Sequence, residues 1–143
     1  MEKLRLNLLV LFAVAGIILA ACSGGASASA SLIGTWELVS YGDPSNPTPA
    51  VAEVDTSVIF GEDGTITGNV GCNGFGGEYE VNGDTITFGS ISSTLMLCAD
   101  TAVGDQETVV LNTLIETVSF AIDGDTLTIT SPDGSSVIVL GRK

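Results

Sequence analysis

The chain has 143 residues, with 17 acidic side chains, 4 basic side chains and no histidine. The basic residues all lie near the ends, as Lys3, Arg5, Arg142 and Lys143. An interior without positive charge excludes proteins that bind nucleic acid through clustered Lys and Arg, and the lack of histidine excludes Ser-His-Asp and Cys-His catalysis. We interpret the acidic surface first as a solubility device, with basic partners or cations as the alternative.

Residues 1–21 are typical of a secretory signal peptide. Lys3 and Arg5 precede an apolar stretch, residues 6–21, that ends in small side chains. As a helix these 16 residues span about 24 Å, which is too short for an anchor across a hydrocarbon core of about 30 Å. We therefore expect residues 1–21 to be removed.

Leu19-Ala20-Ala21-Cys22 resembles a bacterial lipobox. This resemblance implies that the Cys22 thiol receives a diacylglyceryl group, that the chain is cut before it, and that the new amino group is acylated. Two or more acyl chains hold a protein firmly at a membrane, so we expect an extracytoplasmic protein anchored to a bacterial membrane. Ser23 resembles an outer-membrane sorting context if the organism has two membranes.

Residues 22–31 consist of the lipidated cysteine and a Ser/Gly/Ala stretch, which predicts a flexible tether of about 15 to 20 Å. Residues 32–143 have the size of one domain. A first strand is expected over residues 35–41. The loop 42–52 contains Pro44, Pro47 and Pro49, which lack a donor for a sheet interior, so we expect it at an edge or a barrel mouth.

Four turn dipeptides between alternating apolar segments predict antiparallel hairpins; they are Asp63-Gly64, Asn82-Gly83, Asp123-Gly124 and Asp133-Gly134. The expected arms are residues 58–60 with 65–70, 78–81 with 85–88, 118–122 with 126–130, and 126–130 with 137–140. Threonine alternates with large apolar residues in 85–88 and 126–129, which indicates one buried and one solvated face. The glycines between residues 71 and 77 are expected to form a tight, close-packed turn around Cys72.

Residues 105–117 predict the single helix. Val110, Leu111, Leu114 and Ile115 fall on one side of it. Asp105 is expected to cap its start, with Glu107 near the positive end of the helix dipole. The predicted fold is therefore mainly β, in the α+β class: a small antiparallel β-barrel-like sheet of hairpins with one packed α-helix.

Cys72 and Cys98 remain as an even pair once Cys22 is lipidated, and in an oxidising compartment they predict a disulfide. The bond closes a loop of about 27 residues and stabilises the fold by roughly 3.5 kcal/mol in the chain-entropy model. A structural zinc site needs four Cys or His ligands, and a redox-active pair is usually Cys-x-x-Cys. The chain also lacks phosphate-loop, dinucleotide and EF-hand motifs, so we expect no metal and no cofactor.

Three motifs resemble the META domain of HslJ-like lipoproteins over about residues 32–140: Gly34-Thr35-Trp36-Glu37-Leu38, Gly71-Cys72-Asn73-Gly74-Phe75-Gly76-Gly77-Glu78-Tyr79 and Thr94-Leu95-Met96-Leu97-Cys98. The residues that carry the resemblance are Trp36, Gly71, Cys72, Asn73, Phe75, Gly77, Tyr79, Thr94, Met96 and Cys98. It implies a small β-rich barrel with a packed helix, often exported or lipid-anchored, in a family linked to stress and antibiotic tolerance without an established reaction. Many members carry a basic residue where this chain has Leu95, so no role of that charge is transferred.

We expect a non-catalytic module for binding or for stress and antibiotic tolerance. It would be a monomer held at the membrane by its acyl chains, with an envelope protein or cell-wall partner and without nucleic acid. One alternative is a small-molecule binder with Trp36, Tyr41, Phe75 and Tyr79 at the barrel mouth, although core positions are favoured for these aromatics. Another is an envelope hydrolase using Glu78 and Glu80, which share one face of a predicted strand, although solvated carboxylates are favoured.

Overall fold

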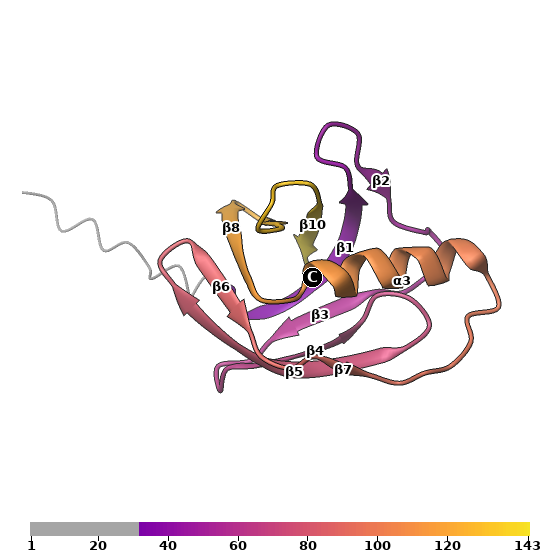
Figure 1. Cartoon of the computed structure of the whole chain (residues 1–143), viewed down its shortest axis with the longest axis horizontal. Coiled ribbons are helices and arrows are strands. Elements are labelled where there is room, and N and C mark those ends of the chain that lie inside the picture. Colours follow the sequence, from indigo (N-terminus) through magenta and orange to yellow (C-terminus); the bar gives the residue numbers. More distant parts are fainter. Residues whose placement is uncertain (1–31) are drawn as a thin grey trace, which may run out of the picture.

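The computed structural model describes residues 32–143, which form one antiparallel sheet of ten strands and a single helix (Figure 1). The predicted signal peptide, Cys22 and the tether lie outside the described residues. The elements in chain order are β1 (Gly34–Gly42), β2 (Thr48–Pro49), β3 (Ser57–Phe60), β4 (Thr65–Asn69), β5 (Gly74–Asn82), β6 (Thr85–Phe88), β7 (Ser92–Ser93), α3 (Thr101–Thr113), β8 (Thr117–Asp123), β9 (Thr126–Thr130) and β10 (Val137–Arg142). Over this part of the chain, α3 falls short of the length and apolarity needed to cross a bilayer.

The sheet closes on itself. Pairing runs from β1 through β3, β4, β5, β6, β8 and β9 to β10, and β10 pairs again with β1, which makes a closed barrel of eight strands. β2 and β7 are two-residue strands attached to β1 and β5. The closing ladder joins the first and last strands, with Trp36 opposite Arg142 and Tyr41 opposite Ile138. The predicted fold class, a mainly β barrel of hairpins with one helix, is confirmed.

All four predicted hairpins are present. Their turn glycines, Gly64, Gly83, Gly124 and Gly134, have φ values of 78°, 63°, 57° and 71°, the left-handed backbone that favours glycine in tight turns. β5 differs from the prediction because it begins at Gly74, four residues early. Only the first part of the glycine-rich stretch forms the expected turn, and the remainder continues the ladder with β4.

The barrel interior is filled by the apolar residues of each strand. In β6 and β9 the threonines point outward while Ile86, Phe88, Leu127 and Ile129 are buried, as the alternation predicts. The four aromatics weighed as pocket residues are buried in this core; they are Trp36, Tyr41, Phe75 and Tyr79. Their preferred interpretation as core residues is confirmed.

The helix begins and ends four residues before the predicted boundaries. Asp100, not Asp105, is its N-cap, and its side chain accepts a hydrogen bond of 2.7 Å from the backbone N–H of Ala102. At the other end Leu114 is the C-cap, and Glu116 follows with a φ of 55° that no helix accommodates. Val110 and Leu114 are buried as expected.

The early end of the helix leaves Ile115 outside it and 48% exposed, so its predicted place on the buried face is wrong. Gln106 is buried in the first half of the helix instead. Its side chain accepts a hydrogen bond from Val51 N (2.7 Å) and donates one to Val70 O (2.7 Å). These bonds fix the helix against the proline-containing loop, which lies at the edge of β1 as predicted, and against the end of β4.

Candidate functional site

The turn between β4 and β5 packs directly against α3. Gly71 lies so close to the helix that a Cβ atom there would be 2.6 Å from Cβ of Glu107 and 3.1 Å from the carbonyl oxygen of Val103. Both distances are shorter than ordinary van der Waals contact, so glycine at position 71 permits the helix to approach. The close approach brings the helix side chains into hydrogen-bonding range of the turn.

Glu107 is buried in this contact, and its carboxylate accepts three N–H groups of the turn. Oε2 accepts from the backbone N–H of Cys72 (2.9 Å) and of Asn73 (2.6 Å), and Oε1 accepts from Nδ2 of Asn73 (2.7 Å). A buried carboxylate needs such donors because it has lost the water that would solvate its charge. The expected position of Glu107 near the start of the helix dipole is therefore wrong: it is in the second turn and binds the β4–β5 turn.

Asn73 connects this carboxylate to the segment that follows β7. Its Oδ1 accepts hydrogen bonds from Met96 N (2.7 Å) and Thr94 Oγ1 (2.7 Å), and its Nδ2 donates to Met96 O (3.1 Å). The orientation of the Asn73 amide is thus fixed, because its oxygen faces two donors and its nitrogen faces an acceptor. We call Asn73, Glu107, Thr94 and Met96 the Asn73 network.

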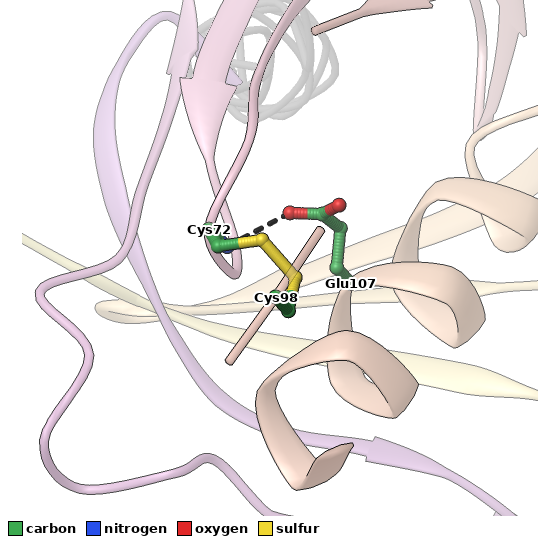
Figure 2. A group of neighbouring side chains, drawn as sticks. All are labelled: Cys72, Cys98 and Glu107. Carbon is green, nitrogen blue, oxygen red and sulfur yellow. Dashed lines mark hydrogen bonds between the residues drawn. A yellow bond between two sulfur atoms is a disulfide. The ribbon is translucent and has the colours of Figure 1, made fainter. Parts of the chain in front are cut away.

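A disulfide joins Cys72 to Cys98 beside the network, as predicted, with a Cα–Cα distance of 5.7 Å. Figure 2 shows Glu107 next to this bond, with its hydrogen bond to Cys72. The sulfur atoms and a carboxylate oxygen lie within 4.8 Å of one another, a grouping that could hold a metal ion. While the sulfurs are bonded to each other, however, neither offers the thiolate that soft metals require.

The network and the disulfide hold a short apolar loop at the surface. Leu95, Met96 and Leu97 are 95%, 61% and 99% exposed. Their backbone is nevertheless fixed: Asn73 binds both the N–H and the carbonyl of Met96, and Cys98 is bonded covalently to the turn. We call Leu95–Leu97 the apolar loop.

A groove of about 520 Å³ runs between the apolar loop and the first turns of α3. Two exposed carboxylates, Asp100 and Asp105, line its helix side. Burial first, and the negative charge of Asp105 second, raise the pKa of the neighbouring Tyr41 above its ordinary value. The groove is thus apolar on one wall and negative on the other.

The structure divides the motif residues into two groups. One group meets at this site and consists of Gly71, Cys72, Asn73, Thr94, Met96 and Cys98. The other is built into the barrel, where Trp36, Phe75 and Tyr79 are core residues and Gly77 admits Ile91, whose Cδ1 would be 2.7 Å from an added Cβ. This second group supports the fold rather than the site.

The residues of the two alternative sites have different surroundings: the carboxylates are exposed and the aromatics are buried. Glu78 and Glu80 do share the outer face of β5, where both are exposed. They border a groove of about 540 Å³ together with Asp63; both side chains are solvated, as favoured for them. The aromatics of the proposed mouth pocket are buried; Tyr79, for example, packs edge-on against Phe60 at 5.1 Å between ring centroids and donates its hydroxyl to Gly61 O.

Sequence reasoning missed the residues that matter most here. The sequence pattern predicts Glu107 only at the start of a helix and places Leu95, Met96 and Leu97 only in a motif, and it assigns no role to Gln106. One signal was available: Leu95, Met96 and Leu97 are consecutive apolar residues outside any predicted strand or helix, and such a run cannot bury all its side chains against one neighbour.

The sequence profile of the META domain matches residues 30–143. No curated protein matches the chain. Among solved structures, an NMR structure of a protein from Burkholderia xenovorans is similar, with a TM-score of 0.67, 17% identity, and 81% of this chain and 86% of that chain covered. A second NMR structure has a TM-score of 0.62 at 20% identity over 78% of this chain and 90% of the other. A crystal structure of a DUF4847 family protein from Bacteroides vulgatus has a TM-score of 0.53 at 16% identity over 78% and 94%. At these identities the likeness concerns the fold alone.

Proposed function

Because the chain belongs to the META domain family, we propose that it is a lipid-anchored, non-catalytic binding module of the bacterial cell envelope. Its partner is an envelope protein or a cell-wall component, and the binding serves stress or antibiotic tolerance of the kind linked to the family. The observation that carries this proposal is the apolar loop: three large apolar side chains are held out in solvent by a buried polar network and a disulfide.

Exposure of these side chains supports a binding role because the fold gains no stability from apolar groups that stay in water. Burying a leucine side chain typically contributes about 1.5 to 3 kcal/mol, and here two leucines contribute almost nothing to the core. A loop whose backbone is already fixed loses little conformational entropy when a partner covers it. The loop therefore suits recognition better than it suits stability.

The N-terminal sequence supports the envelope location. The basic start, the short apolar stretch and Cys22 after Leu19-Ala20-Ala21 favour export and lipidation. The predicted disulfide belongs to an oxidising compartment. For the absence of catalysis, the support is chemical: the sequence has no histidine, and the paired carboxylates Glu78 and Glu80 are on an open, solvated face.

The anchor is tested by the intact mass of the protein purified from membranes without reductant and treated with a thiol alkylating agent. We expect a mass that starts at Cys22 with diacylglyceryl and acyl groups and with no alkylated cysteine. A full-length or unlipidated mass would overturn the anchor, and alkylated thiols would overturn the oxidised state of Cys72 and Cys98.

Binding is tested in living cells with a photo-cross-linking amino acid at position 97, and at position 115 as the matched control. Both side chains are exposed and apolar, but Ile115 lies outside the apolar loop. We expect one discrete adduct, identified by mass spectrometry, at position 97 alone. Adducts that are absent, or equal at the two positions, would contradict a binding role for the loop.

A further inference from the structure

The surroundings of the apolar loop indicate the chemistry of its binding partner, an inference that rests on the proposed function. The apolar loop is rigid at both ends. Thr94 N–H donates to Gly74 O at 3.0 Å before the loop, and Cys98 is bonded to Cys72 after it. A partner therefore meets a preformed ridge of Leu95, Met96 and Leu97, so its own surface needs an apolar depression of matching size.

The charged side chains that line the groove beside the ridge are all acidic. Asp100 and Asp105 line the adjoining groove and are exposed. The sequence has no Lys or Arg between Arg5 and Arg142, so no cation from the middle of the chain balances them. Positive groups at the rim of the partner would gain favourable interactions at both carboxylates, and negative ones would be repelled.

The same charge argues against a second copy of this chain as the occupant. Two copies that met through their apolar loops would also bring Asp100 and Asp105 of each into one interface without a counter-charge. Like charges placed together at an interface cost several kcal/mol in general. Self-association through this face is therefore unfavourable.

The position of the loop argues against the bilayer as the occupant. Gly34, where the described chain enters the barrel, pairs with Phe60 beside the β3–β4 turn. The apolar loop lies beyond the other end of β4, past Asn69 and Gly74. In Figure 1 the β3–β4 turn is at the left, and the segment from β7 to α3 runs to the right. The start of β1 and the apolar loop thus lie at opposite ends of β4.

We propose that the apolar loop and the adjoining groove bind an envelope protein through a segment that combines apolar side chains with Lys or Arg. The apolar side chains cover Leu95, Met96 and Leu97, and the cationic groups pair with Asp100 and Asp105. Binding through this pair of features is weakened by salt, because the carboxylates are at the exposed rim.

The test uses a synthetic amphipathic peptide of leucine and lysine, with a leucine and glutamate peptide as its control. Met96 is one of only two methionines in the chain, the other being Met1, so methionine methyl NMR of the lipidated, membrane-purified protein in detergent reports directly on the loop. We expect the lysine peptide, and not the glutamate peptide, to shift the Met96 methyl resonance, with an affinity that falls as salt is added.

Matched variants separate the loop from general charge attraction. Leu95→Ser with Leu97→Ser should weaken peptide binding by about tenfold, whereas Val39→Ser with Ile115→Ser, which removes exposed apolar groups elsewhere, should leave it unchanged. Asp105→Asn should weaken binding more than Asp123→Asn at the end of β8. Equal losses for the two Asp variants would overturn the proposal, because they would indicate attraction to net charge.

Two further outcomes distinguish the occupant from the binding role itself. Insertion of the Met96 methyl into phosphatidylcholine and phosphatidylglycerol vesicles, lost in the Leu95 and Leu97 variant, would replace the protein partner with a membrane. A loop-specific adduct in cells that Asp105→Asn does not weaken would leave the binding module intact and overturn the cationic partner.

Discussion

The guanidinium carbon of Arg142 lies 4.1 Å from the centroid of the Trp36 ring. The two residues are opposite each other in the ladder that closes the barrel, and Trp36 is completely buried. Arg142 also donates to Ile33 O at 3.4 Å and approaches Asp125 at 3.9 Å. One of the few cations of the chain therefore covers the largest side chain of the core, where the first part of β1 pairs with the end of β10.

Arg142→Ala should destabilise the domain by about 1 to 2 kcal/mol, because it removes a cation–π contact with a desolvated ring and the aliphatic cover over it. Arg142→Lys should lose less, since it keeps the charge but not the planar stack. Asp125→Asn should change little because that ion pair is long and exposed. Urea unfolding followed by far-UV circular dichroism measures the three variants. Equal losses for Arg142→Ala and Asp125→Asn would contradict the stacking account.

Replacing both bridged cysteines, as Cys72→Ser with Cys98→Ser, should lower the free energy of unfolding by roughly 3.5 kcal/mol in the chain-entropy model. The loss arises mainly in the unfolded chain, which gains freedom when the cross-link is removed. Reduction of the wild-type protein with dithiothreitol should give the same value in denaturant titrations. If the reduced protein were as stable as the oxidised one, the disulfide would have no structural role.

Glu107→Gln should destabilise the domain by about 1 to 3 kcal/mol, although it is nearly isosteric. In either orientation its amide nitrogen faces a donor, either the backbone N–H groups of Cys72 and Asn73 or Nδ2 of Asn73. Asn73 cannot turn to compensate, because its Oδ1 is bound to Met96 N and Thr94 Oγ1. Glu78→Gln on the open face of β5 is the matched control and should be nearly neutral.

The acid limb of the stability curve should contain a contribution from Asp133. Hydrogen bonds from the backbone N–H of Ser135 first, and from the hydroxyls of Ser131 and Ser135, lower the pKa of Asp133 to about 2. A carboxyl group whose pKa is depressed by folding contributes stability that is present above its unfolded pKa of about 3.9 and is lost as pH falls toward the folded value. The affected window is therefore about pH 4 to 2.

NMR titration of the Asp133 carboxyl carbon measures this directly. Ser135→Ala removes one of the hydroxyl donors and keeps the backbone one, so it should raise the pKa of Asp133 while leaving it below the ordinary value. Asp133→Asn should remove the corresponding part of the acid-dependent loss. An Asp133 midpoint near 3.9 would show that these bonds do not form in solution.

Local chemistry explains which elements the sequence could predict. The hairpins at Asp63-Gly64, Asn82-Gly83, Asp123-Gly124 and Asp133-Gly134 depend on turn residues adjacent in the chain, and all four are present. The start of β5 was missed because Gly74, Gly76 and Gly77 resemble a turn when considered alone. They are strand residues because they pair with β4. Of the three, only Gly77 leaves space that a neighbour needs, since Cδ1 of Ile91 would be 2.7 Å from an added Cβ.

The helix and the site show where local patterns stop being sufficient. Asp105 is the cap that the sequence predicts, whereas Asp100 caps the helix in the structure. The hydrogen bonds of Gln106 with Val51 and Val70 belong to this earlier start, and both partners are distant in sequence. The pairing of Cys72 with Cys98, by contrast, could be predicted from the number of cysteines and the expected compartment. The contacts of Glu107 could not. The three N–H groups that bind Glu107 come from residues 34 and 35 positions away, a distance over which periodicity carries no information.

Closure of the barrel through β1 and β10 has a consequence for how the protein is made. Hairpins can form as the chain is synthesised, and β1 can pair with β3 early, but its second neighbour is β10, the last strand of the sheet, with six residues. Until β10 is added, β1 and β9 each present an unpaired edge of the kind that recruits other chains, and contacts so distant in sequence form slowly. Addition of β10 is thus the event that pairs both of these edges and closes the barrel.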